Sequence, residues 1–378
     1  MVVYRISGYL QNYAWGIPAG LSAWRGGTDE AVAAGDAPDP EAELWYGAHV
    51  NGPSALVDQP GTLADVVTSA DAPVLVKLLA AARPLSIQIH PPADQAERNF
   101  AAQEADPGLP KLLADGLAKT EMLIAVRPFS VLQGMRDPAL AGAILRAVGG
   151  SAVGAADLVD TGDLKPAIRH LLAIDPVELA ELTKRVPSAA AAAGLAPGGV
   201  EALATVTRNY PGDPGVLVAV LMDQRVLAEG EAVFVPAGVV HAYISGTGVE
   251  VMTTSDNVLR MGLTPKTIAV DEALEALDPA LSPQPMTGDP VTLPSGGQHR
   301  HYAPQGAPFV VDWIGDGSFT APSGDYRLVL AVSSSVSVTV DGAELNLEQG
   351  QAVAVLASEG DLTLFTTGAA VIARPAAQ

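Results

Sequence analysis

The chain of 378 residues carries 42 acidic and 21 basic side chains, which gives a formal net charge of −21 at pH 7. This charge argues against nucleic acid or an anionic membrane surface as a partner, and an anionic substrate would need a local group of basic residues. No run approaches the ~20 apolar residues of a membrane span, and the first residues lack the basic start and apolar core of a signal peptide. With no cysteine, disulfides and cysteine-ligated zinc are excluded, so we expect a cytoplasmic protein of two or three domains.

In chain order, short apolar strands and turn-rich loops come first, and a segment rich in alanine and leucine follows at residues 129–215. Apolar residues recur in this segment at helical spacing. Aspartate precedes proline at 137, 175 and 213, the pattern of an N-cap and first helical turn, and Glu178 fits a capping box with Asp175. We therefore predict a helical insertion.

From about residue 216 the strand pattern returns and runs to the end of the chain. An alternating segment leads into Asp341 and Gly342, a pair typical of a two-residue hairpin. Residues 350–356 repeat the pattern of residues 230–236, but Asp361 stands where the earlier copy leads to a histidine. The later copy is therefore expected to keep its strand and to lose the ligand.

A short strand near residue 88 carries polar residues on one face. Because side chains alternate along a strand, Ser86, Gln88 and His90 point the same way, while Ile87 and Ile89 point to the opposite side. The Cα atoms of Gln88 and His90 lie about 7 Å apart, so both side chains can reach one ion. A half-buried strand with its polar face in water would give the same pattern.

A second segment is more specific. Gly230, Pro236, Gly238 and His241 are spaced as a strand, a turn and the start of another strand, with Tyr243 on the same side as His241. This spacing resembles the second motif of the cupin superfamily, apart from a serine at the asparagine position of that motif. A plain hairpin with a core histidine is the alternative.

Glu121 precedes the apolar strand 122–126 and would supply a carboxylate to the two histidines. A solvated surface glutamate beside Lys119 is the alternative. Together Gln88, His90, Glu121 and His241 make a set of two nitrogens and two oxygens, which suits Zn²⁺ or another divalent ion such as Mn²⁺ or Co²⁺.

These patterns predict a mainly β fold with a helical insertion. The catalytic domain is expected to be a cupin-type (jelly-roll) β-barrel formed by residues 1–128 with 216–265. Residues 129–215 would form an all-α inserted domain, and residues 266–378 a second, C-terminal cupin-like barrel without metal ligands.

Residues 241–266 resemble the signature region of type I mannose-6-phosphate isomerases (phosphomannose isomerases), and so do segments 13–16, 42–49, 85–91 and 210–215. The resemblance implies one zinc ion per chain, bound by Gln88, His90, Glu121 and His241. It also implies a catalytic Arg260, and roles in proton transfer or substrate contact for Asp256, Lys119 and Lys77.

Two positions depart from the family pattern. Ala118 stands where the family often has a histidine proposed to open the sugar ring. Pro92-Ala93 stands where the family often has an Asp-Lys pair after the residues that match His90 and Pro91. Ring opening would then use water, the metal or another group.

The implied reaction interconverts mannose 6-phosphate and fructose 6-phosphate through a cis-enediol(ate), in carbohydrate metabolism that supplies GDP-mannose precursors. A cation near the substrate oxygens stabilises the enediolate, and a base moves the proton between C1 and C2. Asp256 is the first candidate base, with Glu250 and Lys119 behind it. Arg260 is expected to bind phosphate or to stabilise the enediolate, and further candidates for substrate contact are Lys77, Ser86, Trp15, Tyr243 and Lys266.

Two other functions fit a cupin fold. An iron-dependent oxygenase is disfavoured by Gln88 and by the basic residues suited to phosphate, and a non-catalytic sugar-binding bicupin is disfavoured by the complete ligand set. We expect a monomer or weak homo-oligomer. His299 and His301 mimic a ligand motif but have no carboxylate close in sequence, so we expect both to be exposed.

Overall fold

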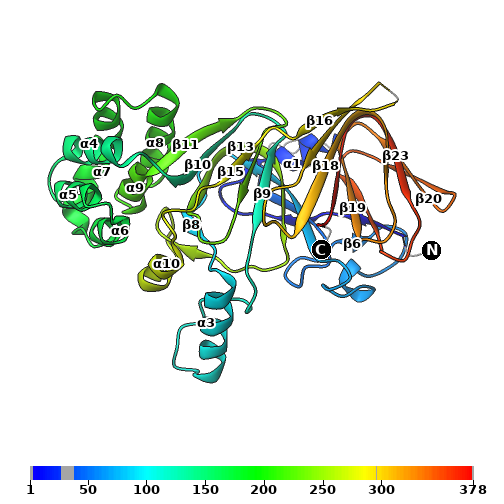
Figure 1. The fold of residues 1–378 in the computed structure, drawn as a ribbon, viewed down its shortest axis with the longest axis horizontal. Helices are drawn as coiled ribbons and strands as arrows, with labels where there is room; N and C mark the ends of the chain where they lie inside the picture. The colour runs from blue at the N-terminus through cyan, green and yellow to red at the C-terminus, as the bar shows by residue number, and fades with distance from the viewer. Residues whose placement is uncertain (1–2, 27–37, 295, 377–378) are drawn as a thin grey trace.

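The computed structural model describes residues 3–26, 38–294 and 296–376. The expectation of no signal peptide rests partly on Met1 and Val2, which lie outside the described residues. The fold is mainly β with several helices, as the sequence predicted. Figure 1 shows strands through the middle and at one end of the molecule, and a group of helices at the other end.

Within the described residues, a first sheet has eleven strands. Seven of them follow one another in the order β15-β12-β9-β13-β7-β5-β2, and β8, β10, β11 and β14 pair beside this path. Their bounds are β2 (Tyr9–Gln11), β5 (Glu43–Tyr46), β7 (Val74–Ala81), β8 (Gln88–Ile89), β9 (Glu121–Ala125), β10 (Phe129–Met135), β11 (Met222–Leu227), β12 (Ala232–Val235), β13 (His241–Thr253), β14 (Leu259–Arg260) and β15 (Gln284–Met286).

The long strand β13 changes the face that it turns inward. Ala242 and Ile244 pack in the core shared with the helices, whereas Val249 and Val251 pack in the core between the two large sheets. The change occurs around Gly246, whose φ of +143° favours glycine and where an added Cβ would lie 2.6 Å from Phe129. As a result, the opposite face of β13 presents Tyr243 before this glycine and Glu250 after it to the same cavity, which is described below.

The helical region is formed by α4 (Pro138–Val148), α5 (Ala152–Asp160), α6 (Leu164–Leu172), α7 (Pro176–Ala192), α8 (Pro197–Asn209) and α9 (Gly215–Val218). The N-caps at Asp137 and Asp175 are confirmed, since their carboxylates accept from backbone N–H groups of α4 and α7. The capping box is wrong, because Glu178 accepts from Ser151 instead. Residues 129–135 are also not helical: their bulky apolar side chains form β10 in the first sheet.

Asp213 does not cap a long helix. Its Oδ1 accepts from the N–H of Gly215 at 2.7 Å and of Leu263 at 2.8 Å, and its Oδ2 accepts from Thr264 at 3.2 Å. The helical region is thereby fastened to the loop that follows β14.

The second large sheet has ten strands among the described residues. They are β1 (Val3–Ser7), β6 (Ala55–Leu56), β16 (Asp289–Thr292), β17 (Gln298–Tyr302), β18 (Phe309–Ala321), β19 (Arg327–Ser333), β20 (Val336–Val340), β21 (Ala343–Leu347), β22 (Gln351–Val355) and β23 (Leu362–Pro375). The hairpin at Asp341 and Gly342 is confirmed: both residues have positive φ, and Val340 pairs with Ala343. β1 and β6 come from the N-terminal third, which we expected to lie wholly in the catalytic domain.

The remaining elements are short strands β3 (Ile17–Pro18) and β4 (Pro40–Glu41), helices α1 (Gly20–Trp24), α3 (Ala93–Ala105) and α10 (Val270–Ala276), and 3₁₀ turns η1 (Leu63–Asp65) and η2 (Ala219–Leu221). In the described part of the chain, no helix is long and apolar enough to cross a membrane.

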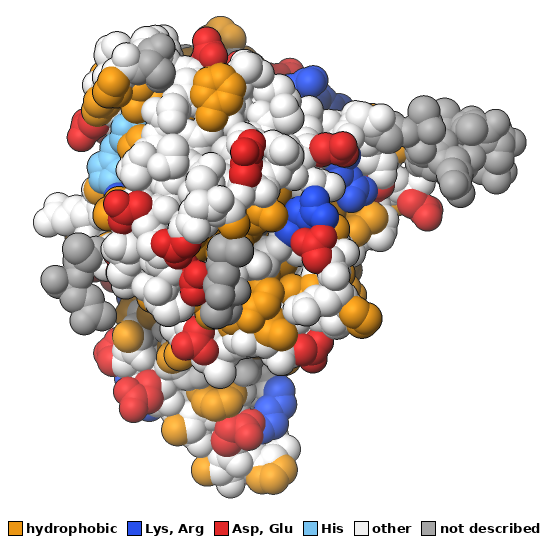
Figure 2. Space-filling model, turned by 90° about the vertical axis from the view of Figure 1, so that its right-hand side faces the viewer, with side chains coloured by type: hydrophobic (Ala, Val, Ile, Leu, Met, Phe, Trp, Pro, Cys, Tyr) orange, Lys and Arg blue, Asp and Glu red, His pale blue; other side chains and the backbone are white. Residues whose placement is uncertain are grey.

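The two large sheets pack face to face through an apolar core. The first sheet contributes residues such as Phe234 and Val251, and the second contributes Phe309 and Trp313. Acidic side chains are scattered over the end of the molecule drawn in Figure 2, in keeping with the net charge of −21. The sites described next therefore belong to a molecule of strongly negative net charge.

Candidate active site and metal centre

Strand pairing places three predicted residues in one row. β8 lies between β13 and β14, so Gln88 is directly opposite His241 on one side and Arg260 on the other. Directly opposite residues of antiparallel strands project from the same face of the sheet. The two segments that the sequence proposed as halves of one site are therefore neighbours.

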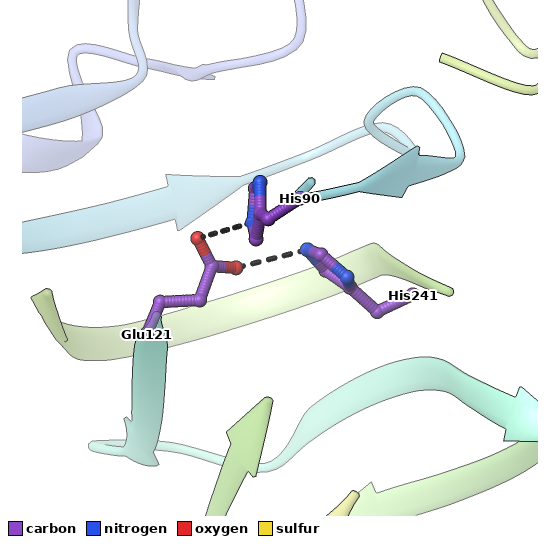
Figure 3. A group of neighbouring side chains, drawn as sticks. All are labelled: His90, Glu121 and His241. Atoms are coloured by element: carbon purple, nitrogen blue, oxygen red, sulfur yellow. Dashed lines mark hydrogen bonds and ion pairs between the residues drawn. The ribbon is translucent and has the colours of Figure 1, made fainter. Parts of the chain in front are cut away.

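His90, Glu121 and His241 meet below this row (Figure 3). His90 Nε2 lies 3.1 Å from Glu121 Oε2, and His241 Nε2 lies 3.0 Å from Glu121 Oε1. All three side chains are at most 2% exposed. The predicted convergence of the two histidines and the carboxylate is present in the structure.

The hydrogen bonds on the far side of each ring make this group fit a cation. His90 Nδ1 donates to the carbonyl of Asn257 at 2.8 Å, and His241 Nδ1 lies 3.2 Å from the carbonyl of Val239. Burial, reinforced by the Lys119 charge, lowers the pKa of His90 to about 4, so its ring is neutral at pH 7. The neutral His90 ring, with Nδ1–H, turns its Nε2 lone pair toward the Glu121 carboxylate, and His241 points its Nε2 at the same group, an arrangement that a shared metal ion would stabilise.

Two further groups hold the carboxylate in place. Lys119 Nζ lies 3.0 Å from Glu121 Oε2, and the Tyr243 hydroxyl donates to Oε1 at 2.8 Å. Burial raises the pKa of Glu121, but the Lys119 charge and the two histidines outweigh it and hold that pKa well below its usual range. Glu121 is therefore ionised and oriented.

A cavity of about 770 Å³ opens above this group. His90 and His241 lie beneath its floor, and the other predicted residues all line it: Gln88, Glu121, Arg260, Asp256, Lys119, Glu250, Lys77, Ser86, Trp15, Tyr243 and Lys266. The structure thus brings together side chains from the first sheet, the loop after β14 and the N-terminal segment.

A second buried group lies on one wall of the cavity. Lys77 Nζ is 3.5 Å from Glu250 Oε2 and 3.9 Å from Glu43 Oε2, and it lies 4.3 Å from the ring centre of Trp45. Burial, together with the Glu121 charge, raises the pKa of Glu250 to about 7. Although burial opposes its charge, the two carboxylates raise the pKa of Lys77 above its usual range.

Asp256 lies at the rim with two partners. Asn51 Nδ2 donates to its Oδ2 at 2.7 Å, and His49 Nε2 lies 3.4 Å from the same oxygen. Burial lowers the pKa of His49, and its Nδ1 accepts from the Asn51 N–H at 3.2 Å, so the neutral ring presents Nε2–H to Asp256. These contacts fix the direction of the carboxylate.

The cations of the cavity differ in their pairing. Lys77 and Lys119 are ion-paired, whereas Arg83, Arg260 and Lys266 have no ion pair among the described residues. Burial lowers the pKa of Arg260, with no carboxylate beside it to offset the effect. The cavity therefore joins an acidic floor to a rim of unpaired positive charge.

The comparisons with known proteins agree with this site. The family model "Phosphomannose isomerase type I, catalytic domain" matches residues 3–138. The mannose-6-phosphate isomerase of Escherichia coli is 32% identical over 288 residues, covering 70% of this chain and 71% of the relative. The human mannose-6-phosphate isomerase is 30% identical over 386 residues, with 90% and 88% covered. The chain belongs to the type I phosphomannose isomerase family.

Solved structures agree over the whole length. The mannose 6-phosphate isomerase of Salmonella typhimurium bound to fructose 6-phosphate and zinc has a TM-score of 0.83 at 25% identity, with 100% of both chains covered. A zinc-bound holo structure of mannose 6-phosphate isomerase has a TM-score of 0.82 at 25% identity. The family assignment does not favour the oxygenase and the non-catalytic bicupin.

Some members of the site were not predicted. Glu43 and Asn51 each lie within or next to the segment 42–49 that carries the family resemblance, but no spacing rule connects them with Lys77 or Asp256. Asn257 was missed because it reaches His90 through its backbone carbonyl, which no side-chain pattern reveals. Its amide also fastens the loop before Lys119, through bonds to Ala114, Asp115 and Leu117.

One expectation about the C-terminal region was wrong. His299 is buried, at 8% exposure, and a carboxylate lies beside both His299 and His301. That carboxylate belongs to Asp312 on the neighbouring strand, so proximity in the sheet, not in the sequence, brings it to the histidines.

Proposed function

We propose that this chain is a zinc-dependent mannose-6-phosphate isomerase, which interconverts mannose 6-phosphate and fructose 6-phosphate through a cis-enediol(ate). The observation that carries the proposal is the buried group of His90, Glu121 and His241 below a cavity with unpaired cations at its rim. Family membership and the fructose 6-phosphate and zinc in the Salmonella structure support the same substrate and metal.

We assign the zinc ligands to His90, His241, Glu121 and Gln88. Gln88 is half-buried, lines the cavity and lies directly opposite His241. When bound there, zinc would polarise the carbonyl and hydroxyl oxygens of the open-chain sugar and so stabilise negative charge on the enediolate.

Asp256 is the base in this proposal. Its carboxylate lines the cavity and is oriented by Asn51 and His49, so it can take a proton from one carbon and return it to the next. Glu250 and Lys119 lie deeper and are already engaged by Lys77 and Glu121. We assign these two to hydrogen bonds with the substrate oxygens.

The phosphate is assigned to the cationic rim. Arg260 and Lys266 are unpaired among the described residues, and Ser86 lines the same cavity. Arg83 lies five residues before the start of β8 and adds a further charge that the sequence reasoning did not use. Lys77, held by two glutamates, suits a sugar hydroxyl better than the phosphate, while Trp15 and Tyr243 form the walls.

The finer architecture also belongs to this proposal. We assign the first sheet to a cupin-type barrel, residues 138–218 to an all-α insertion and the second sheet to a C-terminal cupin-like barrel. β1 and β6 join the last of these, and β10 and β15 join the catalytic barrel. A cytoplasmic location and a monomeric or weakly associated state are part of the same proposal.

The proposal is tested with purified protein, mannose 6-phosphate and a coupled assay for fructose 6-phosphate. Turnover should disappear on treatment with a chelator and return on addition of Zn²⁺, and unphosphorylated mannose should turn over far more slowly. Sugar phosphate binding without turnover, in protein loaded with zinc, would contradict the proposed function.

A further inference from the structure

A second group of two histidines and a carboxylate lies in the C-terminal sheet. His299 and His301 are alternate residues of β17, and Asp312 lies on β18 directly opposite His301. Asp312 Oδ1 is 2.8 Å from His299 Nε2 and 2.7 Å from His301 Nδ1. Two imidazole nitrogens from one strand thus converge on a single oxygen of the next.

The group lies on the inner side of this sheet. Asp312 shares its strand face with Ile314, which belongs to the core of the C-terminal strands, and the Phe319 ring lies 4.4 Å from the His299 ring. Asp312 is 1% exposed, whereas the His301 side chain is 32% exposed. The carboxylate is therefore buried, but the group can be reached from solvent on the His301 side.

The surroundings orient the carboxylate and add a donor. Arg374 Nε lies 3.3 Å from Asp312 Oδ2, which leaves Oδ1 directed at the two rings. On the other side of β17, the exposed Asp289 of β16 is directly opposite His301 and projects from the same face. Two nitrogens and two carboxylates are thus available within one small region of the sheet.

We propose that His299, His301 and Asp312 form a second cation site, which binds a divalent ion of the zinc, cobalt or nickel class with Asp289 as a fourth donor. Imidazole and carboxylate ligands suit these ions. The site is separate from the cavity in the first sheet, and the proposal does not depend on the isomerase activity.

Binding requires only small local changes. With metal–ligand bonds of about 2.0–2.1 Å, tetrahedral ligand atoms lie roughly 3.3 Å apart, so the rings must move away from Asp312 by about half an ångström. Each ring must also present a lone pair, not an N–H, on the nitrogen that faces Asp312, and the hydrogen bond to Asp312 raises the pKa of His301, so a proton competes with the ion there. Arg374 repels a cation, as Lys119 does beside Glu121, and both rings must give up their hydrogen bonds to Asp312, so we expect weaker affinity than at the site of Glu121.

The alternative is a buried carboxylate that is simply neutralised by two histidines and an arginine. A cation site and a neutralised carboxylate both explain the hydrogen bonds. Only the cation site requires that a metal still bind when the site of Glu121 has been removed. Metal content therefore separates them.

The test uses the full chain with Glu121→Ala, which removes the first site, and compares it with Glu121→Ala/His301→Ala. After dialysis against Co²⁺, we expect one ion per chain and a visible cobalt absorption band in the first protein, and neither in the second. Zn²⁺ should raise the Tm of the first protein only. Adding His170→Ala to Glu121→Ala, which changes a histidine outside both groups, should leave the bound ion in place.

The number of zinc ions bound by the chain without substitutions gives an independent measurement. This chain should bind two zinc ions, and His301→Ala should bind one and keep isomerase activity within twofold. One ion per chain in both of these proteins, or no cobalt in the Glu121→Ala protein, overturns the second site.

Discussion

Two groups of similar composition, each with two histidines and one acid, lie in the two sheets of this chain. In the first sheet, Glu121 is held by Lys119 and Tyr243, and both histidines donate Nδ1–H to backbone carbonyls. In the second sheet, Asp312 is held by Arg374, and both histidines already hydrogen-bond to it. Both groups offer the same types of metal ligand, so the residues around each group must determine its function.

The two groups differ most in what lies next to them. The first group forms the floor of a cavity that contains further acids and unpaired cations, whereas the second lies beside a wholly apolar core. We therefore expect a cation in the first group to meet a substrate, and one in the second group to stabilise the fold. The following predictions test this difference, from the largest expected effect to the smallest.

Glu121→Ala should abolish isomerase activity, by on the order of 10³-fold or more, because the carboxylate that joins the two histidines is lost. Zinc at the first site should be lost with it. Activity and metal content are measured together, and Glu97→Ala, an exposed glutamate on α3, serves as control. Retained activity in a protein without zinc at this site would rule out the metal-dependent mechanism.

Arg260→Ala should keep the zinc but lower kcat/KM by roughly 10²–10³-fold, as expected for loss of a cation that stabilises charge on the substrate. Steady-state kinetics and metal analysis distinguish this result from loss of metal. Arg127→Ala, an exposed arginine outside the cavity, is the matched control. If the Arg260 variant lost its metal, our separation of ligand and catalytic residues would be wrong.

Glu250 makes the stability of the metal-free protein depend on pH. Its pKa is about 7 in the folded protein and near 4.5 when unfolded, so the unfolded state favours ionisation. As pH rises from 4.5 through 7, the free energy of unfolding should fall by about 3 kcal/mol through this group, at about 1.4 kcal/mol per pKa unit. Glu250→Gln should lose this slope in unfolding experiments between pH 5 and 8.5, and an unchanged slope would contradict the assignment.

Asn51→Ala should lower kcat about tenfold, because Asp256 loses the hydrogen bond that orients it. KM should change little, and the pH profile of kcat should shift, since the environment of the proposed base changes. Asn12→Ala, whose exposed side chain donates to the carbonyl of Pro40, is the control. An altered KM with an unchanged kcat would indicate that Asp256 binds the substrate and does not transfer the proton.

His301→Ala should have the smallest effect on turnover, less than twofold, even though it belongs to a histidine–carboxylate group of similar composition. Kinetic assays with mannose 6-phosphate give this comparison directly. A large loss of kcat in a folded His301→Ala protein would show that the second sheet contributes to the reaction.

The sequence predicted the local parts of the site well, since strand alternation and motif spacing depend on neighbouring residues. Ser86, Gln88 and His90 share a face, and His241 and Tyr243 both reach Glu121 or its surroundings, as expected. Contacts made across strands were harder. Asp312 follows His301 by 11 residues, at no motif spacing, and only the pairing of β17 with β18 brings it to His301.

The predicted domain boundaries were also displaced by strand pairing, because the sequence of one segment does not reveal which strand it pairs with. Residues 129–135 pair with β11 and β13, although alanine-rich sequence follows them, and residues 284–286 add to β12. Likewise, Glu178 fits a capping box by spacing but accepts instead from Ser151, the residue that precedes α5. In each case, a tertiary contact outweighs the local preference.

The pairing of β1 with β22 has a consequence for biosynthesis. Residues 3–7 leave the ribosome long before their partner at 351–355 has been made. Because pairing across such a sequence separation is slow, β1 keeps this edge unpaired until residues 351–355 have been made. Chains that end before residue 355 therefore expose an unpaired strand edge that can pair with other chains. Binding of such chains by chaperones should fall once residue 355 has emerged from the ribosome.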